Sequence, residues 1–343
     1  MPAARIKPYI RKFAAFAKAQ TYSKRERVKF AQYVGKPRDA VRGRGDSLAL
    51  IEYTLDGKRD KVKIAIERIK SFDPLTTGFM DTPYYVAYSG GKDSDAVRIL
   101  FELAGARYDL VHNHTTVDAP ETVYYTRSIP KIQISYPDIS MWALIVKKRM
   151  PPTRLARYCC EYLKERGGEG RFVVTGVRWK ESASRAKRRG SVEAMKSGRD
   201  NNRLILNADN DEHRKQIESC ITKNKFILNP IVDWTDDEVW ELLHAHGCNS
   251  NPLYECGFKR VGCIGCPMAG RKGMMKGFEL YPKYKAAYIR AFDKMLKKRD
   301  ADGLHASGWK TAEDVFNWWI SDTKREKVDP QQVSILDFEG VTF

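Results

Sequence analysis

The part of the chain richest in reactive side chains is the run Ser89-Gly90-Gly91-Lys92-Asp93-Ser94. Paired glycines let backbone N–H groups approach an anion closely, the lysine adds a positive charge, and the serine hydroxyls donate hydrogen bonds. An apolar run from Tyr84 to Tyr88 precedes it and predicts a buried strand, and the apolar spacing from Asp95 to Leu103 predicts a helix. Because a helix N-terminus attracts anions, this order predicts a phosphate-binding loop, with an ordinary strand-turn-helix as the plain alternative.

Cysteines form the second chemical feature of the chain. Cys159 and Cys160 are adjacent, and Cys263 and Cys266 form a C-x-x-C pair. Four thiolates in this pattern suit a tetrahedral zinc ion or an iron–sulfur cluster, and the spacing by itself does not choose between them. Seven cysteines in total fit a reducing compartment better than a disulfide framework.

The loop sequence SGGKDS resembles the PP-loop of the ATP pyrophosphatases, whose relatives include the phosphoadenosine phosphosulfate (PAPS) reductase family, tRNA thiolation enzymes and DNA phosphorothioation sulfurtransferases. Proteins of this kind split ATP between its α and β phosphates and leave AMP on an acceptor oxygen. The resemblance implies ATP and Mg²⁺ as cofactors and catalytic roles for Lys92 and Asp93, with Asp93 holding Mg²⁺. It also implies nucleotide contacts from the whole loop: Ser89, Gly90, Gly91, Lys92, Asp93 and Ser94.

A second strand-like run, Arg171 to Gly176, is followed by alternating basic and hydroxyl residues. It resembles the G-x-R-x-x-E-S-x-x-R motif of the reductase family. The resemblance implies cofactor contacts from Gly176, Arg178 and Glu181. It makes Arg178 and Arg185 catalytic arginines that bind a phosphate or the acceptor's anionic group in bidentate fashion, with Glu181 orienting them. A solvated charged surface is the alternative for either arginine taken alone.

The segment Asn229 to Trp240 resembles the family's P-I-x-D-W-x-x-x-x-V-W block. Within it, Thr235 predicts the N-cap of a helix that continues to His244, with acidic residues in its first turn. We interpret this block as structural.

Four further polar residues lie at the end of an expected strand over Tyr108–His114 or in the loop that follows it. His112 and His114 alternate and so face one side, but strand histidines are more often structural groups, and we leave them out of the predicted site. Asp118 and Glu121 lie in the loop that follows, where ribose or magnesium contacts are expected.

The segments around the cysteines resemble the C-C and G-F/Y-x-x-x-G-C-x-x-C elements that hold a 4Fe-4S cluster in adenylylsulfate reductases. This resemblance implies that Cys159, Cys160, Cys263 and Cys266 are the cluster ligands, with structural zinc as the alternative. Cys256, seven residues before Cys263, is the other candidate for one ligand position. Cys220 and Cys248 lack a motif, and we interpret them as small packing or surface residues.

One departure from the reductase pattern bears on function. Assimilatory sulfonucleotide reductases attack sulfur with a cysteine on a C-terminal tail and usually carry a degenerate loop. Here the loop is intact, and the 77 residues after Cys266 contain no thiol. The combination favours ATP-dependent sulfur transfer over sulfate assimilation.

The chain is strongly basic, with 61 Lys and Arg against 43 Asp and Glu and a formal charge of +18. Residues 1–45 hold thirteen of the basic residues and only two acids, interleaved with aromatic residues. Such a segment suits a nucleic-acid backbone. Solvated helix faces or an organelle transit peptide are the alternatives. Without an apolar run of membrane-spanning length or a signal sequence, the expected protein is soluble and cytoplasmic.

Alternation of strands and helices from Tyr84 onward predicts an α/β fold with a parallel sheet and helices on both faces. The resemblance makes it Rossmann-like, of the adenine nucleotide alpha hydrolase-like kind. The predicted divisions are a basic helical arm and linker (1–46), a PP-loop domain with the cysteines (47–270), and a C-terminal helical extension (271–343). In the extension, helices are expected over Phe278–Lys298 and Thr311–Trp319.

Three functions remain open at this point. The first is an ATP-dependent enzyme that adenylates an acceptor, expected to be DNA or tRNA, and replaces its oxygen with sulfur; its partner would be a sulfur donor such as a cysteine desulfurase. The second is a reductase of PAPS or adenylylsulfate that releases sulfite. The third is a cluster-bearing nucleotide sensor. The intact loop favours the first, and the sequence leaves the oligomeric state open.

Overall fold

The computed structural model describes residues 49–54, 57–74, 76–77, 81–165, 167–182, 186–187, 189–196, 203–206, 224–304 and 308–321. The predicted basic arm, Arg185 and Cys220 lie outside these residues. No helix in the described ranges is both long enough and apolar enough to cross a membrane.

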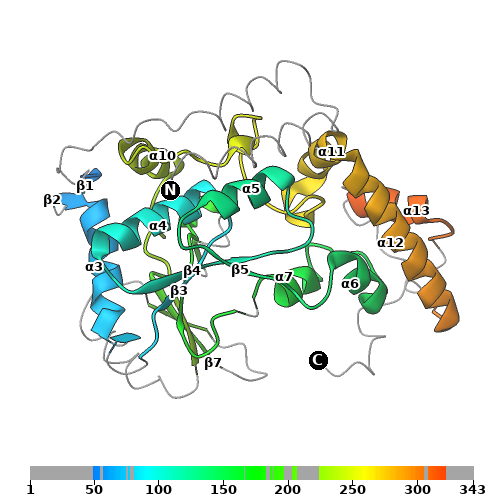
Figure 1. The fold of residues 1–343 in the computed structure, drawn as a ribbon, viewed down its shortest axis with the longest axis horizontal. Helices are drawn as coiled ribbons and strands as arrows, with labels where there is room; N and C mark the ends of the chain where they lie inside the picture. The colour runs from blue at the N-terminus through cyan, green and yellow to red at the C-terminus, as the bar shows by residue number, and fades with distance from the viewer. Residues whose placement is uncertain are drawn as a thin grey trace, which may run out of the picture.

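The strands and helices alternate along most of the chain (Figure 1). The strands are β1 (Ile51–Thr54), β2 (Gly57–Asp60), β3 (Tyr84–Ala87), β4 (Tyr108–Asn113), β5 (Gln133–Ser135), β6 (Phe172–Val174), β7 (Val192–Lys196), β8 (Arg203–Leu206) and β9 (Asn224–Leu228). The α-helices are α3 (Lys61–Pro74), α4 (Lys92–Ala104), α5 (Pro120–Ser128), α6 (Met141–Lys148), α7 (Tyr158–Leu163), α10 (Asp236–Ala245), α11 (Gly270–Leu280), α12 (Pro282–Ala301) and α13 (Ala312–Ile320). Short 3-10 helices are η3 (Trp179–Glu181), η5 (Pro252–Tyr254) and η6 (Pro267–Ala269).

The main sheet has seven strands in the order β5-β4-β3-β6-β9-β7-β8. The first five pair in parallel, and β7 pairs antiparallel with both β9 and β8. The predicted class is confirmed: the fold is a Rossmann-like, mostly parallel sheet flanked by helices. The antiparallel edge was not predicted, because the pairing of β7 with β9 joins residues that are distant in the sequence.

The central strand β3 is apolar on both faces, as expected for a parallel strand in the middle of a sheet. Tyr84 and Val86 face α3 and α4 in the larger core, and Tyr85 packs with Val111 and Val173 on the other face. Helix α10 packs against α4 and adds Leu242 to the larger core. As a result, the loop after β3 is held between β3 and α4, both of which are packed in the larger core.

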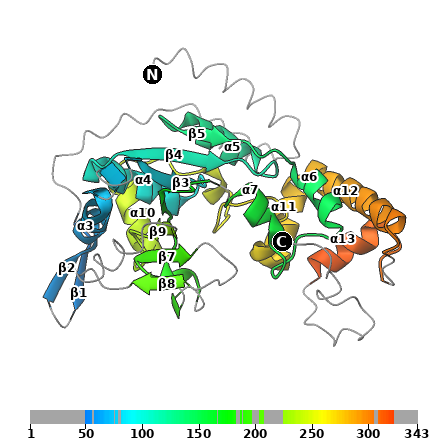
Figure 2. The ribbon, with the colours of Figure 1, turned by 90° about the horizontal axis from the view of Figure 1, so that it is seen from below.

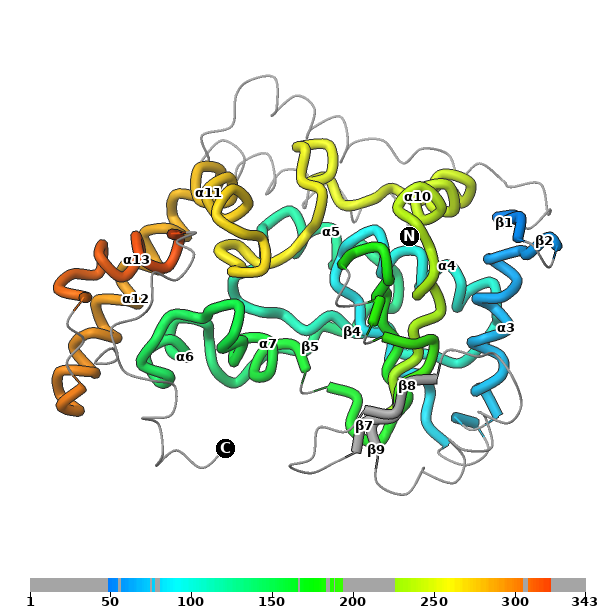
Figure 3. The backbone as a smooth tube through the Cα atoms, turned by 180° about the vertical axis from the view of Figure 1, so that it is seen from behind, coloured from blue at the N-terminus to red at the C-terminus, as the bar shows by residue number. Residues whose placement is uncertain are grey.

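A second core joins the middle of the chain to its C-terminal helices. Leu144 of α6, Phe278 of α11, Phe292 of α12 and Trp319 of α13 are all buried in it. Figures 1 and 2 show these C-terminal helices at the opposite end of the molecule from β1, β2 and α3. The tube in Figure 3 shows the same separation from behind.

The predicted helices near Thr235 and in the C-terminal extension are confirmed with one change. Thr235 and Thr311 each cap a helix N-terminus through the side-chain oxygen, which accepts from Glu238 N–H and Asp314 N–H. The single helix expected over Phe278–Lys298 is instead two helices, α11 and α12, that meet at Tyr281. Pro282 opens α12 because proline fits the first turn of a helix but cannot continue the preceding one.

Two leucines of α4 provide a matched test of this packing. Leu100 is fully buried, whereas Leu103 on the same helix is 38 % exposed. We expect Leu100→Ala to lower the free energy of unfolding by about 2–5 kcal/mol, because it leaves a cavity in the larger core. Leu103→Ala should cost about 1 kcal/mol or less. Chemical denaturation of both variants measures this, and equal losses would show that α4 does not pack on the sheet by this face.

Candidate functional site

The predicted phosphate loop lies between β3 and α4, at the carboxyl end of the central strand. Gly90 has a φ of +75°, a conformation that side chains rarely adopt, and a Cβ there would lie 2.9 Å from Thr126 Oγ1. Ser94 closes the turn, since its Oγ donates to Gly91 O at 2.7 Å and accepts from Gly91 N at 3.2 Å. Ser89 Oγ lies 3.3 Å from Ser94 Oγ. The loop residues predicted to bind phosphate therefore lie together at a helix N-terminus.

Two cations and two carboxylates meet at the first turn of α4. Lys92 Nζ lies 3.1 Å from Asp93 Oδ1 and 2.8 Å from Asp236 Oδ1. Arg178, which follows β6, contacts the same two carboxylates at 2.7 and 2.5 Å. We call Lys92, Asp93, Arg178 and Asp236 the charge cluster.

The charge cluster is open to solvent on one side. Lys92 and Arg178 are only 5 % and 2 % exposed, whereas the Asp236 side chain is 67 % exposed. The hydrogen bond from Lys92 is the main cause that lowers the pKa of Asp236. A phosphate that approaches from the Asp236 side could replace this carboxylate on both cations, which makes the cluster a candidate anion site.

Gly176 is required by the close approach of two backbones. A Cβ at this position would lie 2.9 Å from both the carbonyl carbon and the carbonyl oxygen of Asp93. The strand end that carries Arg178 can therefore approach the start of α4 only with glycine here. This explains the glycine of the second sequence motif in physical terms.

Other predicted residues of this motif differ in their contacts. The Arg178 guanidinium is oriented by Asp93 and Asp236, and Glu181 accepts instead from the Arg178 backbone N–H at 3.3 Å. Glu181 also pairs with Arg260 at 3.2 Å. For the Arg178 guanidinium, the two aspartates therefore have the orienting role predicted for Glu181. Arg185, the other arginine that Glu181 was predicted to orient, lies outside the described residues.

Three residues that the sequence did not single out hold the loop in place. Asn251 Nδ2 donates to Gly90 O at 3.0 Å and to Thr122 Oγ1 at 3.1 Å. Tyr254 accepts a hydrogen bond from the Lys92 backbone N–H at 2.9 Å. No local motif marks Asn251 or Tyr254, because their role depends on the chain returning to the loop more than 150 residues later. Asp236, interpreted as a first-turn helix residue, is the third.

Helix α4 also carries a buried acid directly behind the loop. Asp95 is fully buried and accepts hydrogen bonds from Tyr88 at 2.5 Å and Tyr125 at 2.9 Å. Burial raises the pKa of Asp95 to about 6. These bonds tie the end of β3 to α4 and α5 and hold the loop at both ends.

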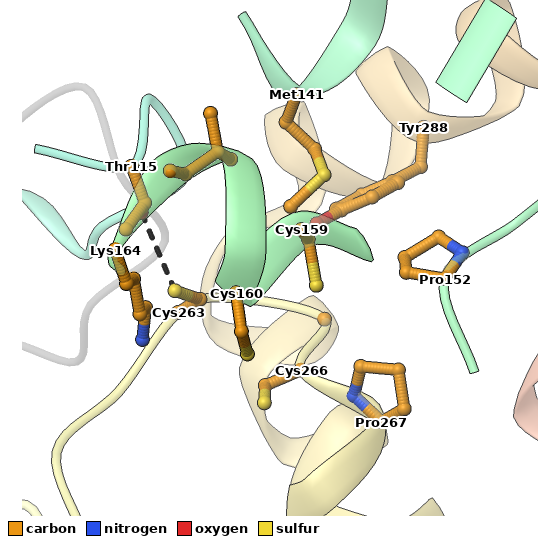
Figure 4. Close-up of a pocket in the computed structure, with 12 residues that line it drawn as sticks. Thr115, Met141, Pro152, Cys159, Cys160, Lys164, Cys263, Cys266, Pro267 and Tyr288 are labelled. Carbon is orange, nitrogen blue, oxygen red and sulfur yellow. Dashed lines mark hydrogen bonds between the residues drawn. The ribbon is translucent and has the colours of Figure 1, made fainter. Parts of the chain in front are cut away.

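All four predicted cysteine ligands line one pocket (Figure 4). Cys159 and Cys160 lie on α7, and Cys263 and Cys266 lie in the loop before η6. Their sulfur atoms point toward a shared space in Figure 4. Cys256, the alternative candidate, is not among the residues that line this pocket.

The electrostatics of the pocket favour deprotonated sulfur at some positions. A hydrogen bond from Cys159 lowers the pKa of Cys160, while the pKa of Cys159 is raised. Burial raises the pKa of Cys263 to about 11. Lys164 also lines the pocket, and Cys263 is the main cause that raises the pKa of this lysine. A cation beside several thiols is the environment that a negatively charged metal–thiolate group requires.

The distances between the sulfur atoms can be compared with those around a bound zinc ion. Four thiolates on one zinc ion, each about 2.3 Å from it, lie about 3.8 Å apart. Within the described ranges, no three cysteine sulfurs lie within 4.8 Å of one another; the group that meets this limit is His112, His114 and Asp118. Among the described cysteines, the sulfurs are therefore spread more widely than the ligands of one bound zinc ion.

The phosphate loop and the cysteine pocket are connected through the end of β4 and the segment that follows it. His112 Nδ1 lies 2.9 Å from Tyr88 O, immediately before the loop. Asp118 forms a β-bridge with Cys263, and Cys263 Sγ lies 3.3 Å from Thr115 Oγ1. Asp118 and Glu121 were expected to contact ribose or magnesium, but their contacts indicate other roles. Asp118 pairs with His114, and Glu121 accepts a hydrogen bond from Tyr281 in the C-terminal part of the chain.

A glycine-rich loop between a parallel strand and a helix, with an arginine after the neighbouring strand, defines an α/β protein of the PP-loop class. The family follows from comparison with known sequences. The phosphoadenosine phosphosulfate reductase domain matches residues 83–269, more than half of the chain, and the chain belongs to this family.

Similar proteins cover only parts of the chain. It is 25% identical over 210 residues to an uncharacterised protein of Methanocaldococcus jannaschii, covering 57% of this chain and 44% of the relative. It is 29% identical over 158 residues to an uncharacterised 37.8 kDa protein of Escherichia phage 186, covering 43% and 39%. A stretch of 59 residues is 34% identical to adenosine 5'-phosphosulfate reductase of Staphylococcus saprophyticus, covering 17% and 21%. The matches span less than half the length of these relatives.

Among solved structures, the chain is similar to a PAPS reductase from Candida auris in a phosphate complex, with 14% identity and a TM-score of 0.37 over 64% of this chain and 98% of that one. It is also similar to the U34-tRNA thiolase NcsA from Methanococcus maripaludis with its [4Fe-4S] cluster. That match has 11% identity and a TM-score of 0.34 over 75% of this chain and 86% of that one.

The close approach at Gly176 yields a direct test of the site. We expect Gly176→Ala to weaken ATP binding about tenfold or more, because the new methyl group displaces the backbone of Asp93 and the start of α4. Gly308→Ala is the control, since a Cβ there meets no atom within 4 Å. Isothermal titration with ATP measures both. Wild-type affinity in the Gly176 variant would show that this contact does not shape the nucleotide site.

Proposed function

We propose that this protein uses ATP to adenylate an oxygen of a nucleic acid and replaces that oxygen with sulfur, with a 4Fe-4S cluster held by Cys159, Cys160, Cys263 and Cys266. The observation that carries the proposal is the short connection between the phosphate loop and the cysteine pocket. His112 contacts the residue before the loop, and Asp118 pairs with Cys263 in the same segment. An acceptor activated at the loop would therefore lie near the thiols.

The charge cluster supplies what the adenylation step needs. The acceptor oxygen attacks the α-phosphorus of ATP, the bond to the β-phosphate oxygen breaks, and pyrophosphate leaves. Lys92 and Arg178 stabilise the negative charge that develops on the phosphate oxygens, because both are buried and already oriented. Asp93 and Asp236 are the carboxylates positioned to hold Mg²⁺ once the phosphates bind the two cations.

The cysteine pocket supplies the second half of the proposed reaction. Sulfide-level sulfur from the donor would displace AMP from the activated acceptor. A 4Fe-4S cluster in the pocket would aid this delivery as a bound group without an open iron position, because all four thiols would ligate it. The four thiols hold the group, and Lys164 balances its negative charge. A sulfur donor such as a cysteine desulfurase is the partner that this chemistry requires.

Nucleic acid is the proposed acceptor because of the charge of the chain. Residues 1–45 hold thirteen basic residues and two acids, within a total of +18. A segment of this kind neutralises backbone phosphates, so its contribution to binding should fall with salt. A cytoplasmic location is part of the same proposal.

The second candidate is a sulfonucleotide reductase that produces sulfite, and the family itself favours it. The chain also matches several adenosine 5'-phosphosulfate reductases over short stretches. In this case Lys92 and Arg178 would bind the sulfonucleotide phosphate. Release of sulfite from PAPS or adenylylsulfate without ATP would establish it, whereas nucleotide binding with neither product would leave a cluster-bearing sensor.

Loss of Lys92 tests the adenylation step. We expect Lys92→Ala to weaken ATP binding about 10- to 100-fold, the size of a lost charged hydrogen bond, and to abolish formation of AMP and pyrophosphate. The exposed Lys70 on α3 is the control position, and Lys70→Ala should behave as wild type. Pyrophosphate release is measured with tRNA and with DNA as acceptors. Sulfite production by wild type, with no pyrophosphate from any acceptor, would reject the proposal for the reductase.

Replacement of a single cysteine tests the cluster. Anaerobically purified protein should contain about four irons and four sulfides per chain, and Cys266→Ser should lose most of both. Cys248→Ser should retain them, because Cys248 lies by Arg98 and not in the pocket. Elemental analysis and the visible absorption spectrum measure the outcome. Stoichiometric zinc without sulfide would replace the cluster assignment with a structural zinc site.

A further inference from the structure

His112, His114 and Asp118 form a compact group of metal-ligand side chains apart from the cysteines. His112 is near the end of β4 and His114 directly follows the strand, so the two alternate onto the same side. One nitrogen of each histidine and one oxygen of Asp118 all lie within 4.8 Å of one another. His112 and Asp118 are only 4 % and 7 % exposed, so this group is built into the protein and is not a surface coincidence.

His112 carries a buried nitrogen that no protein atom satisfies. Its Nδ1 lies 2.9 Å from Tyr88 O, and because a carbonyl only accepts, Nδ1 bears the proton. Its Nε2 is buried and has no hydrogen-bond partner. Asp118 Oδ2 is 3.9 Å away, beyond hydrogen-bond distance, so Nε2 is unsatisfied whether or not it is protonated. A metal ion at Nε2 would satisfy it.

The surrounding hydrogen bonds are those that orient metal ligands. Ligating histidines almost always donate their other ring N–H to a carbonyl or carboxylate, as His112 does to Tyr88. Asp118 is held by Thr115, whose backbone N–H and hydroxyl each donate to it at 2.7 Å. The carboxylate therefore keeps its orientation without help from either histidine.

One ligand distance already matches a shared ion, and the second is slightly longer. Two ligands that each lie about 2.1 Å from a zinc ion are about 3.0–3.4 Å apart. Asp118 Oδ2 lies 3.1 Å from His114 Nδ1 and 3.9 Å from His112 Nε2, so small side-chain rotations would bring all three onto one ion. His114 would bind the ion through Nδ1 as a neutral imidazole, with its proton on Nε2.

We propose that His112, His114 and Asp118 bind a divalent first-row transition metal ion, with zinc as the representative ion. Two imidazoles and one carboxylate are a ligand set typical of zinc or ferrous iron, and three protein ligands leave coordination positions for water or a substrate oxygen. Asp118 Oδ1 lies 4.0 Å from Cys263 Sγ, and His112 contacts the residue before the phosphate loop. The ion would thus lie between the two halves of the candidate site.

Equilibrium dialysis of the anaerobically purified full chain against zinc tests the proposal. His114→Ala is the main variant, because His114 is partly exposed and Thr115 still holds Asp118 after its removal. This variant should lower the affinity for one zinc ion by more than about 100-fold, because a ligand itself is lost. Loss of a residue that only hydrogen-bonds to a ligand has a smaller effect. Thr115→Val removes the hydroxyl that donates to Asp118, and it should lower the zinc affinity about 10- to 100-fold. His244→Ala, at an exposed histidine of α10, should have no effect.

Zinc X-ray absorption distinguishes this site from the cysteines. We expect nitrogen and oxygen ligands for the ion that His114→Ala removes, with iron and sulfide contents unchanged in that variant. Zinc binding equal to wild type in His114→Ala, or bound zinc with sulfur ligands alone, would overturn the proposal. Because the readout is zinc and not turnover, the result is independent of whether the protein transfers sulfur.

Discussion

Burial of two cations at the start of α4 is the constraint on which the candidate site depends. Lys92 and Arg178 are almost inaccessible to water, and a buried charge is stable only when it is paired. Asp93 and Asp236 supply that pairing from two further positions of the chain. The arrangement requires β3 and β6 to end, and α10 to begin, at one place. It also requires glycine at position 176, so that the backbones can meet.

The same constraint explains why the site is poised for an anion. Carboxylates pair with both cations, and the Asp236 carboxylate is mostly exposed to solvent. A phosphate group can therefore take the place of Asp236 without leaving either buried cation unpaired. Until an anion binds, Tyr254 Oη accepts a hydrogen bond from the Lys92 N–H, one of the N–H groups at the N-terminus of α4 that have no partner within the helix. Membership of the PAPS reductase domain family agrees with a nucleotide at this position.

The second core shapes the pocket that the four cysteines line. Cys159 and Cys160 lie on α7, and the C-terminal helices bury Tyr288 against the same pocket. Tyr288 donates to Ile264 O at 2.9 Å, and so fixes the C-x-x-C loop between its two cysteines. The helices α11 to α13 therefore shape the cysteine pocket, although none of them carries a thiol.

Local pattern in the sequence determined the elements and most of the candidate residues. The strand over Tyr84–Ala87, the loop glycines and the caps at Thr235 and Thr311 all follow from short stretches, because neighbouring residues decide strand, turn and helix geometry. That Cys159 and Cys160 meet the distant C-x-x-C was implied by the family resemblance and not by local pattern.

Only the tertiary structure decided which residues meet. Asp236 belongs to a helix that looked structural, and Asn251 and Tyr254 reach the loop from far along the chain. His112 reaches Tyr88 O only because β4 pairs with β3. Contacts of this kind depend on strand order and on the return path of the chain. A single sequence carries no periodic signal for either, since both are set by the packing of the whole sheet.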